Sequence, residues 1–455
     1  MENCIVNTSG MDAYYHENQL LADSFLNTYF FKSFHKSIPH PKRSLELIVS
    51  PKCNLGCKYC YVHKYRKQIF DENIFDEDCT IINLKRILKW MEKNEFNPDL
   101  DIFSGELFAQ EIGFKVLEVI FEHEEKLAED LRCRVITVPT NFTFLNSMQL
   151  TDRIKDLQNR FQDIGIKLFL SASFDGACME ENRPYTKVLD FDINQYRDDD
   201  YYNKVFQYCK DNDCGLHPMI YSKNIDKWKD NFLWFQEKME QFGIAWEDLY
   251  LLNVRNEEWN DYSINEFEKF IEFLYDWTFE KVGHNPEYLV NFLLKGHGFN
   301  ILSNPFTIVG RGLTCGLQNA LCVRLSDLMV YPCHRTGYEH YYCGQFVEDE
   351  ENVLKYKNKN AELLITVYSV HKEGMPACAQ CPVNKMCPGQ CLGACHESNN
   401  NLFVPIPSVC ATVYALVSAS IRSLLKHNAY TILLAQADAE IVEQLEYVKK
   451  ELNLC

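Results

Sequence analysis

The chain has 455 residues, 46% of them hydrophobic and 13% aromatic, with a formal net charge of −18 at pH 7. This composition is typical of a globular protein, and the length predicts more than one structural unit. The negative charge argues against binding to nucleic acid or to an anionic membrane surface. We find no signal peptide at the N-terminus and no run of about 18 consecutive apolar residues. We therefore expect a cytoplasmic protein, in which the 20 cysteines serve as metal ligands more often than as disulfides.

The predicted elements divide the chain into five parts. Residues 1–43 form an N-terminal extension, in which 18–36 has helical periodicity. Over 44–260, short apolar strands alternate with amphipathic helices, which predicts βα units around a parallel sheet. The strands are expected at 45–49, 100–103, 135–138, 167–173, 216–221 and 249–254, and helices at 82–93, 114–131 and 225–242. A helical bridge follows over 261–310, then a loop-like, cysteine-dense region over 311–412 and a helical segment over 413–455.

Three cysteines follow the first predicted strand, in the sequence Cys53-Asn-Leu-Gly-Cys57-Lys-Tyr-Cys60. Thiolates are the preferred ligands of iron–sulfur clusters, and three of them leave one iron of a [4Fe–4S] cube open. The alternative is a zinc knuckle, with His63 as fourth ligand. The pattern, with Tyr59 before the last cysteine, resembles the signature of the radical S-adenosylmethionine (SAM) superfamily. That resemblance implies a partial (β/α)6 barrel and an open iron that chelates SAM, which is then cleaved to a 5′-deoxyadenosyl radical.

Further matches to this family fall where strands end. Phe103-Ser-Gly-Glu-Leu107 resembles the Gly-Gly-Glu-Pro motif, although it keeps only the central Gly105 and Glu106. Pro139-Thr-Asn-Phe-Thr143, Ser173-Phe-Asp-Gly176 and Asn182-Arg-Pro184 are similar to other SAM-proximal stretches. Each is an ordinary turn when taken alone. The resemblance implies SAM contacts from Gly105, Glu106, Thr140, Asn141, Ser173, Asp175 and Arg183.

A second cysteine array lies in the region 311–412. Its C-x2-C-x5-C-x3-C core and flanking cysteines are similar to the SPASM domain, which follows the radical SAM barrel in peptide-modifying enzymes. Leu328 stands where that family commonly has a glycine, five residues before the third cysteine. The resemblance implies two auxiliary [4Fe–4S] clusters, and three clusters in all. The first would be held by Cys315, Cys322, Cys333 and Cys391, and the second by Cys378, Cys381, Cys387 and Cys410. Cys343 and Cys395 are left over, and Cys395 is an alternative ligand.

The resemblance implies a peptide maturase that abstracts hydrogen from a ribosomally made precursor peptide and installs a thioether or other crosslink. An alternative is an anaerobic sulfatase-maturing enzyme, which forms formylglycine. In that group an aspartate follows the third SPASM cysteine, where this chain has His334. A third alternative is a non-catalytic iron–sulfur electron carrier. Expected partners are the precursor peptide, an electron donor such as flavodoxin or ferredoxin, and a separate leader-binding protein, since only 43 residues precede the first strand.

Overall fold

The computed structural model describes residues 44–64, 72–296, 299–309, 320–338, 341–349, 353–360, 363 and 375–454. The N-terminal extension and Cys315 lie outside the described residues. The strands are β1 (Ser44–Ser50), β2 (Asp99–Ser104), β3 (Val135–Thr140), β4 (Lys167–Ala172), β5 (Met219–Ile220), β6 (Leu252–Asn253), β7 (Ala320–Arg324), β8 (Met329–Tyr331), β9 (Gly344–Glu348) and β10 (Leu354–Asn358).

The first six strands form a curved parallel sheet. β1 to β4 pair in parallel in chain order. Two parallel bridges, from Ala172 to Leu216 and from Leu216 to Leu249, extend the pairing to the short β5 and β6. The architecture is therefore an α/β fold with a sheet like a partial TIM barrel, and the prediction of this fold class is confirmed.

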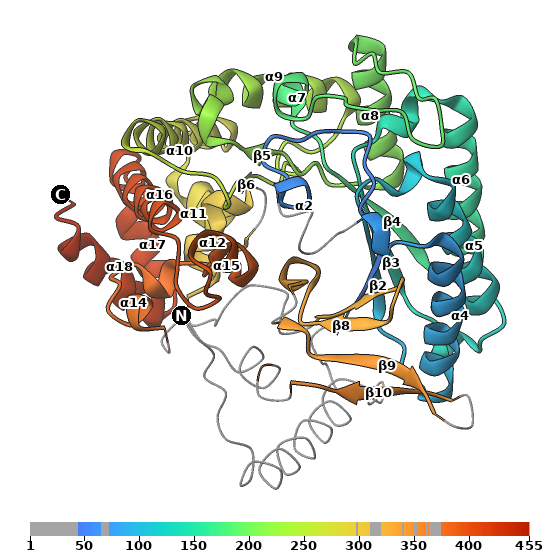
Figure 1. Ribbon diagram of the computed structural model, residues 1–455. Coiled ribbons are helices and arrows are strands. Elements are labelled where there is room, and N and C mark those ends of the chain that lie inside the picture. The colour runs from blue at the N-terminus through green and yellow to red at the C-terminus, as the bar shows by residue number, and fades with distance from the viewer. Residues whose placement is uncertain are drawn as a thin grey trace, which may run out of the picture.

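Helices cover the outer side of this sheet (Figure 1). They are α4 (Glu77–Lys93), α5 (Glu111–Glu124), α6 (Met148–Asp163), α8 (Asp199–Asn212) and α9 (Trp228–Phe242), with short α2 (Tyr61–Lys64) and α7 (Met179–Asn182) in the loops. Because side chains alternate along a strand, Leu45, Leu47 and Val49 of β1 point into the main core, where helix residues such as Leu84 also pack. Glu46, Ile48 and Ser50 alternate with them and belong to the opposite, concave face.

The cysteine-dense region is more regular than the sequence suggests. β7 pairs in parallel with β1, and β8, β9 and β10 continue the sheet as an antiparallel meander. One eight-stranded sheet results, in the order β10-β9-β8-β7-β1-β2-β3-β4. These strands have three to five residues, which is too short to show a clear period between the cysteines. The predicted loop-like character is therefore wrong for the four segments that form β7 to β10.

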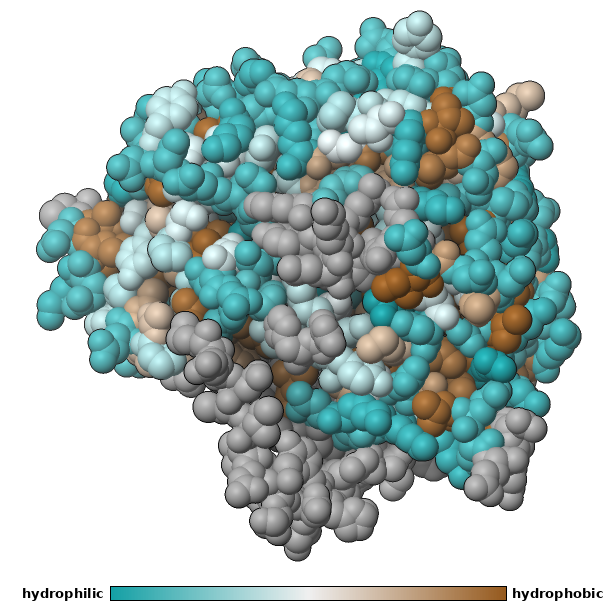
Figure 2. Space-filling view, in the orientation of Figure 1, coloured by the Kyte–Doolittle hydropathy of each residue, from teal (hydrophilic) through white to brown (hydrophobic). Residues whose placement is uncertain are grey.

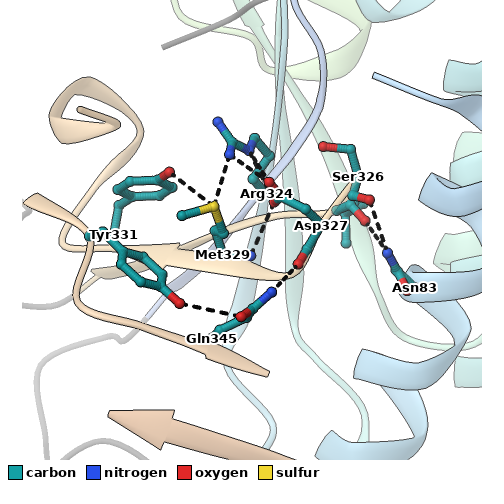
Figure 3. A network of polar contacts seen from close by, with 9 residues as sticks. Asn83, Arg324, Ser326, Asp327, Met329, Tyr331 and Gln345 are labelled. Atoms are coloured by element: carbon teal, nitrogen blue, oxygen red, sulfur yellow. Dashed lines mark hydrogen bonds and ion pairs between the residues drawn. The ribbon is translucent and has the colours of Figure 1, made fainter. Parts of the chain in front are cut away.

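Polar contacts fix the turn between β7 and β8 and attach it to the barrel (Figure 3). The Arg324 guanidinium donates to the Asp327 carboxylate through Nε and Nη2, at 3.0 and 2.5 Å. Gln345 of β9 donates to the Asp327 carbonyl, at 3.0 Å. Asn83 of α4 donates to the Leu325 carbonyl, at 2.7 Å. The turn thus joins the meander to a barrel helix.

Helices follow the barrel and end the chain. They are α10 (Asp261–Lys281), α11 (Pro286–Leu294), α12 (Asn300–Thr307), α14 (Pro376–Ala379), α15 (Leu392–Asn399), α16 (Pro407–Lys426), α17 (Tyr430–Gln436) and α18 (Ala439–Glu451). Among the described helices, α16 alone is long and apolar enough to cross a membrane, and 56% of the window that passes this test is buried. It packs on α10, where Arg422 pairs with Glu268 and Glu272, so it is a core helix. The face in Figure 2 is mostly hydrophilic, with apolar residues in small separate patches.

Candidate functional site

The first cysteine motif forms a loop at the carboxyl end of β1. Cys53 is buried, whereas Cys57 and Cys60 are partly exposed. The loop is held against residues 182–186 by backbone hydrogen bonds from Gly56 N to Pro184 O, at 2.8 Å, and from Lys58 N to Asn182 O, at 2.9 Å. The structure therefore brings two motifs together that are more than 120 residues apart.

The three thiols of this loop suit a metal cluster. Burial raises the pKa of Cys57 to about 11 and that of Cys53 well above its usual range, and the neighbouring thiols add to the rise in Cys53. They stay protonated until a metal replaces the proton. Among the described residues, no three His, Cys, Asp or Glu side chains converge as they would on one metal ion. His63 Nε2 lies 2.9 Å from the Leu55 carbonyl oxygen. The three thiols therefore remain the candidate ligands of this loop.

Glu106 is a buried carboxylate at the end of β2. It accepts hydrogen bonds from Thr140 Oγ1 at 2.8 Å, from Asn141 N at 2.7 Å and from Phe108 N at 3.3 Å. Burial raises its pKa from 4.5 to about 7, although these hydrogen bonds oppose the rise. Because its charge also raises the pKa of Cys53, Glu106 lies near the cysteine loop. No described cation pairs with it, so a ligand ammonium group would supply the missing positive charge.

Gly105 allows this close approach of β2 to the cysteine loop. A Cβ atom on Gly105 would lie 2.3 Å from the Lys52 carbonyl oxygen and 2.5 Å from that of Pro51. Its own N–H donates to the Ser50 carbonyl, at 2.8 Å. A glycine is therefore required here by packing, which explains why the motif keeps it.

A buried amide network joins the cysteine loop to the end of β3. Asn141 Nδ2 donates to Asn54 Oδ1, at 2.9 Å, and Asn54 Nδ2 donates to Thr143 Oγ1, also at 2.9 Å. Gln110 plays a similar part between β1 and β2, since its Nε2 donates to the carbonyls of Lys52 and Glu106, at 2.8 Å each. The sequence analysis missed Asn54, Thr143 and Gln110 as site residues. The position of Asn54 inside the cysteine motif was the available signal.

Asp175 and Arg183 form a buried ion pair below the loop. Arg183 Nη2 lies 3.1 Å from Asp175 Oδ1. The Asp175 carboxylate also accepts from the Tyr59 hydroxyl, from Asn182 Nδ2 and from Met219 N. With these four donors and no exposed surface, Asp175 holds Tyr59 and Arg183 in place.

Arg183 keeps a donor that the ion pair does not use. Its Nε is buried without a described hydrogen-bond partner. The Arg183 charge acts on Cys57 and Cys60, which places the guanidinium near the cysteine loop. Ser173 lies close by, and its backbone N–H donates to the Thr140 carbonyl, at 2.9 Å.

The second cysteine array surrounds a cavity of about 50 Å³. Four of its lining residues, Cys378, Cys381, Cys387 and Cys410, are the predicted ligands of one auxiliary cluster. Cys395 lines it as well. Burial raises the pKa of Cys410 to about 11 and that of Cys395 to about 12. The structure thus brings together a donor set that fits a thiolate-bound cluster, with one thiol more than such a cluster needs.

Three of the other predicted auxiliary ligands, Cys322, Cys333 and Cys391, belong to the described residues. Cys322 of β7 is fully buried, and the charges of Cys333 and Cys343 act on it. Cys391 immediately precedes α15, and its charge acts on Arg335 and Cys395. The described part of the structure therefore groups Cys322 and Cys333 with the unassigned Cys343.

His334 follows Cys333 and contacts the concave face of the barrel. Its Nδ1 lies 3.0 Å from Oε2 of Glu46, and its backbone N–H donates to the same oxygen, at 2.6 Å. Its ring stacks on Phe103, with 4.3 Å between the centroids. Burial acts to raise the pKa of Glu46, but the contacts with His334 outweigh it and leave that pKa lowered. Sequence reasoning gave Glu46 no role, because its partner is 288 residues away.

The fold is similar to that of a known protein, although the sequence is not. No family model matches the chain, and no curated protein matches it in sequence. The solved structure of native anSMEcpe with bound AdoMet is similar, with a TM-score of 0.53 at 20% identity, over 86% of this chain and 100% of that one. That likeness shows the fold: over most of its length the chain has the same architecture as anSMEcpe.

Proposed function

We propose that the chain is a radical SAM peptide maturase that abstracts hydrogen from a ribosomally made precursor peptide and installs a thioether or other crosslink. One observation carries the proposal. The loop of Cys53, Cys57 and Cys60 meets Glu106 and Arg183 at the carboxyl ends of parallel strands, where barrel enzymes place their active sites. When bound, the cluster and SAM supply a 5′-deoxyadenosyl radical.

The protein's own residues bind and orient the cofactor in this proposal. Cys53, Cys57 and Cys60 hold three irons. Glu106 accepts a hydrogen bond from the SAM ammonium group, and its three hydrogen bonds to Thr140, Asn141 and Phe108 fix the carboxylate for this purpose. Arg183, oriented by Asp175, offers its Nε to the carboxylate or ribose.

A sulfatase-maturing activity is the second candidate, because the fold resembles that of anSMEcpe. The residue after Cys333 favours the peptide maturase. His334 occupies this position in place of the aspartate, and its Nδ1 lies 3.0 Å from Oε2 of Glu46. An imidazole oriented by a carboxylate is a good proton acceptor. In the maturase reaction we assign His334 to accept the substrate proton.

The proposed reaction needs a substrate, an electron donor and a cellular location. The substrate is a precursor peptide, delivered by a separate leader-binding protein. The electron that starts SAM cleavage comes from a flavodoxin or ferredoxin. The enzyme acts in the cytoplasm, without nucleic acid or membrane.

The test is SAM cleavage by the full chain after anaerobic reconstitution. We expect 5′-deoxyadenosine in the presence of reductant, and none from a variant in which Cys53, Cys57 and Cys60 are replaced by alanine. Two kinds of peptide are then supplied as substrates. The first are peptides encoded by neighbouring reading frames, and the second is a sulfatase peptide with a Ser or Cys at the target position. Mass loss of two hydrogens in a neighbouring-frame peptide supports the maturase, whereas formylglycine in the sulfatase peptide supports the second candidate. A chain that binds zinc and no labile sulfide contradicts both.

A further inference from the structure

Two polar side chains approach the sulfur atoms of the cavity that Cys378, Cys381, Cys387 and Cys410 surround. Gln390 Nε2 lies 2.9 Å from Cys410 Sγ. Tyr414 Oη lies 3.4 Å from Cys381 Sγ. Both side chains line the cavity itself. Two of the four predicted cluster ligands therefore have a polar side-chain partner, and a third, Cys387, accepts from the backbone N–H of Gly389 at 3.3 Å.

The neighbours of Gln390 determine which end of its amide faces the sulfur. Its Oε1 lies 2.7 Å from the backbone nitrogen of Ile406, which can only donate. Its Nε2 lies 3.1 Å from the Ile406 carbonyl oxygen, which can only accept. A flipped amide would lose both hydrogen bonds, so the NH2 group must face Cys410. Gln390 is therefore a fixed donor to this sulfur.

The direction of the Tyr414 hydrogen bond depends on the state of Cys381. Either atom can donate while the thiol carries its proton. A cysteine that binds a cluster has lost this proton and can only accept. Once Cys381 has lost its proton, the Tyr414 hydroxyl carries the only hydrogen that can lie between the two atoms. The hydroxyl is then the donor and the sulfur the acceptor.

We propose that Gln390 and Tyr414 raise the reduction potential of the auxiliary cluster held in this cavity. The inference rests on the proposed function, because it needs the cluster to be present. A hydrogen bond to a ligand sulfur stabilises the reduced cluster more than the oxidised one, since the reduced cluster carries one more negative charge. Gln390 and Tyr414 are positioning residues that act through Cys410 and Cys381.

The experiment measures potentials rather than turnover. The full chain with Cys53, Cys57 and Cys60 replaced by alanine carries only the auxiliary clusters, which are titrated electrochemically and followed by electron paramagnetic resonance. Tyr414→Phe removes one hydroxyl and keeps the ring. Gln390→Glu keeps the oxygen that accepts from Ile406 N–H but replaces the donor with a second oxygen. Tyr288→Phe, at an exposed tyrosine of α11, is the matched control.

We expect one of the two midpoint potentials to become more negative in Tyr414→Phe, and to fall further in Gln390→Glu. The other potential, the iron content and the Tyr288→Phe control should not change. Unchanged potentials in Tyr414→Phe at full iron content overturn the inference, even where Gln390→Glu fails to load. The proposed function survives that result if the unaltered chain still cleaves SAM. A chain without any iron overturns both.

Discussion

The carboxylate of Glu106 is buried among hydrogen-bond donors but has no described cation beside it. Its pKa of about 7 lies above the ordinary value of 4.5 because burial disfavours the charge. The folded state of the free protein holds this proton more tightly than the unfolded chain does. The free energy of unfolding therefore falls as the pH rises from the ordinary pKa of 4.5 through about 7. A ligand with an ammonium group favours the charged form, so its binding should follow the opposite trend.

We predict that SAM binds more tightly as the pH rises from 6 to 8, and that Glu106→Gln removes this dependence. A charge-assisted hydrogen bond contributes about 1.5–3 kcal/mol, so the variant should bind SAM about one to two orders of magnitude more weakly. Glutamine is preferable to alanine, because its oxygen still accepts from Asn141 N while the Thr140 hydroxyl can turn to accept from the new NH2. Calorimetry measures both effects on reconstituted protein. Unchanged affinity in the variant would show that the ammonium site lies elsewhere.

Leu328 has a backbone conformation that suits glycine. Its φ is +62°, in the left-handed region. The turn between β7 and β8 holds it there through hydrogen bonds from Leu328 N to Arg324 O, at 2.8 Å, and from Phe346 N to Leu328 O, at 3.0 Å. The departure from the family's glycine therefore keeps the turn, while the buried side chain adds packing.

We predict that Leu328→Gly is more stable than Leu328→Ala. Each variant loses a buried leucine side chain, at a cost of about 2–5 kcal/mol. Glycine recovers about 1–2 kcal/mol of the left-handed strain. Thermal unfolding of both variants measures the difference. At Leu321 of β7, which is equally buried but does not have a positive φ, the alanine variant should be the more stable one. The same order at both positions would contradict the strain argument.

At the scale of elements, the cysteine loop depends on its packing against the segment 182–186. A Cβ atom on Gly56 would lie 2.5 Å from Cγ2 of Thr186, although the backbone of Gly56 is not left-handed. The hydroxyl of Thr186 donates to the Asn54 carbonyl, at 3.1 Å. The Thr186 methyl group is therefore the obstacle, and the hydroxyl is the useful part of that side chain.

We predict that Gly56→Ala lowers stability by about 1–3 kcal/mol, as overpacking does, and weakens cluster binding in the loop. Combining it with Thr186→Ser should restore both, because serine lacks the methyl group but keeps the hydroxyl. Denaturant unfolding and iron content are measured for both variants, with Thr186→Ser alone as the control. A double variant as impaired as Gly56→Ala would mean that the loop needs glycine for another reason.

The sequence predicts the parallel strands well and the meander poorly. Runs such as Leu45–Val49 are apolar and bounded by polar residues, so their extent is visible in the sequence. β5 and β6 have only two paired residues each, although runs of six were expected there, because curvature limits regular pairing. The SAM motifs could be placed at strand ends, but contacts such as Thr140 to Glu106 and Met219 to Asp175 could not, since each joins elements 34 or 44 residues apart in the chain.

At the scale of the whole molecule, one sheet joins the barrel to the cysteine-rich region. β7 lies beside β1, with Cys322 opposite Glu46 in the register. Arg335 reaches back to the first cysteine motif, where its guanidinium lies over the Tyr61 ring, 4.7 Å from the centroid, and its fork pairs with Glu397. The predicted cluster sites are therefore held in a fixed relation, which suits a single reaction that uses all of them.

This arrangement predicts that the first cysteine array is needed for SAM cleavage and the second for formation of the modified peptide. Three clusters give twelve iron atoms per chain, and alanine at Cys53, Cys57 and Cys60 should leave about eight and abolish 5′-deoxyadenosine formation. Cys381→Ala removes a ligand from the cavity near α16, more than 300 residues in sequence from Cys53, Cys57 and Cys60, so SAM cleavage should continue while modified peptide is lost. Iron analysis, chromatography of 5′-deoxyadenosine and mass spectrometry of the peptide separate these effects. Full product yield from a Cys381→Ala protein shown to lack both auxiliary clusters would remove those clusters from the mechanism, because the barrel alone would then complete the reaction.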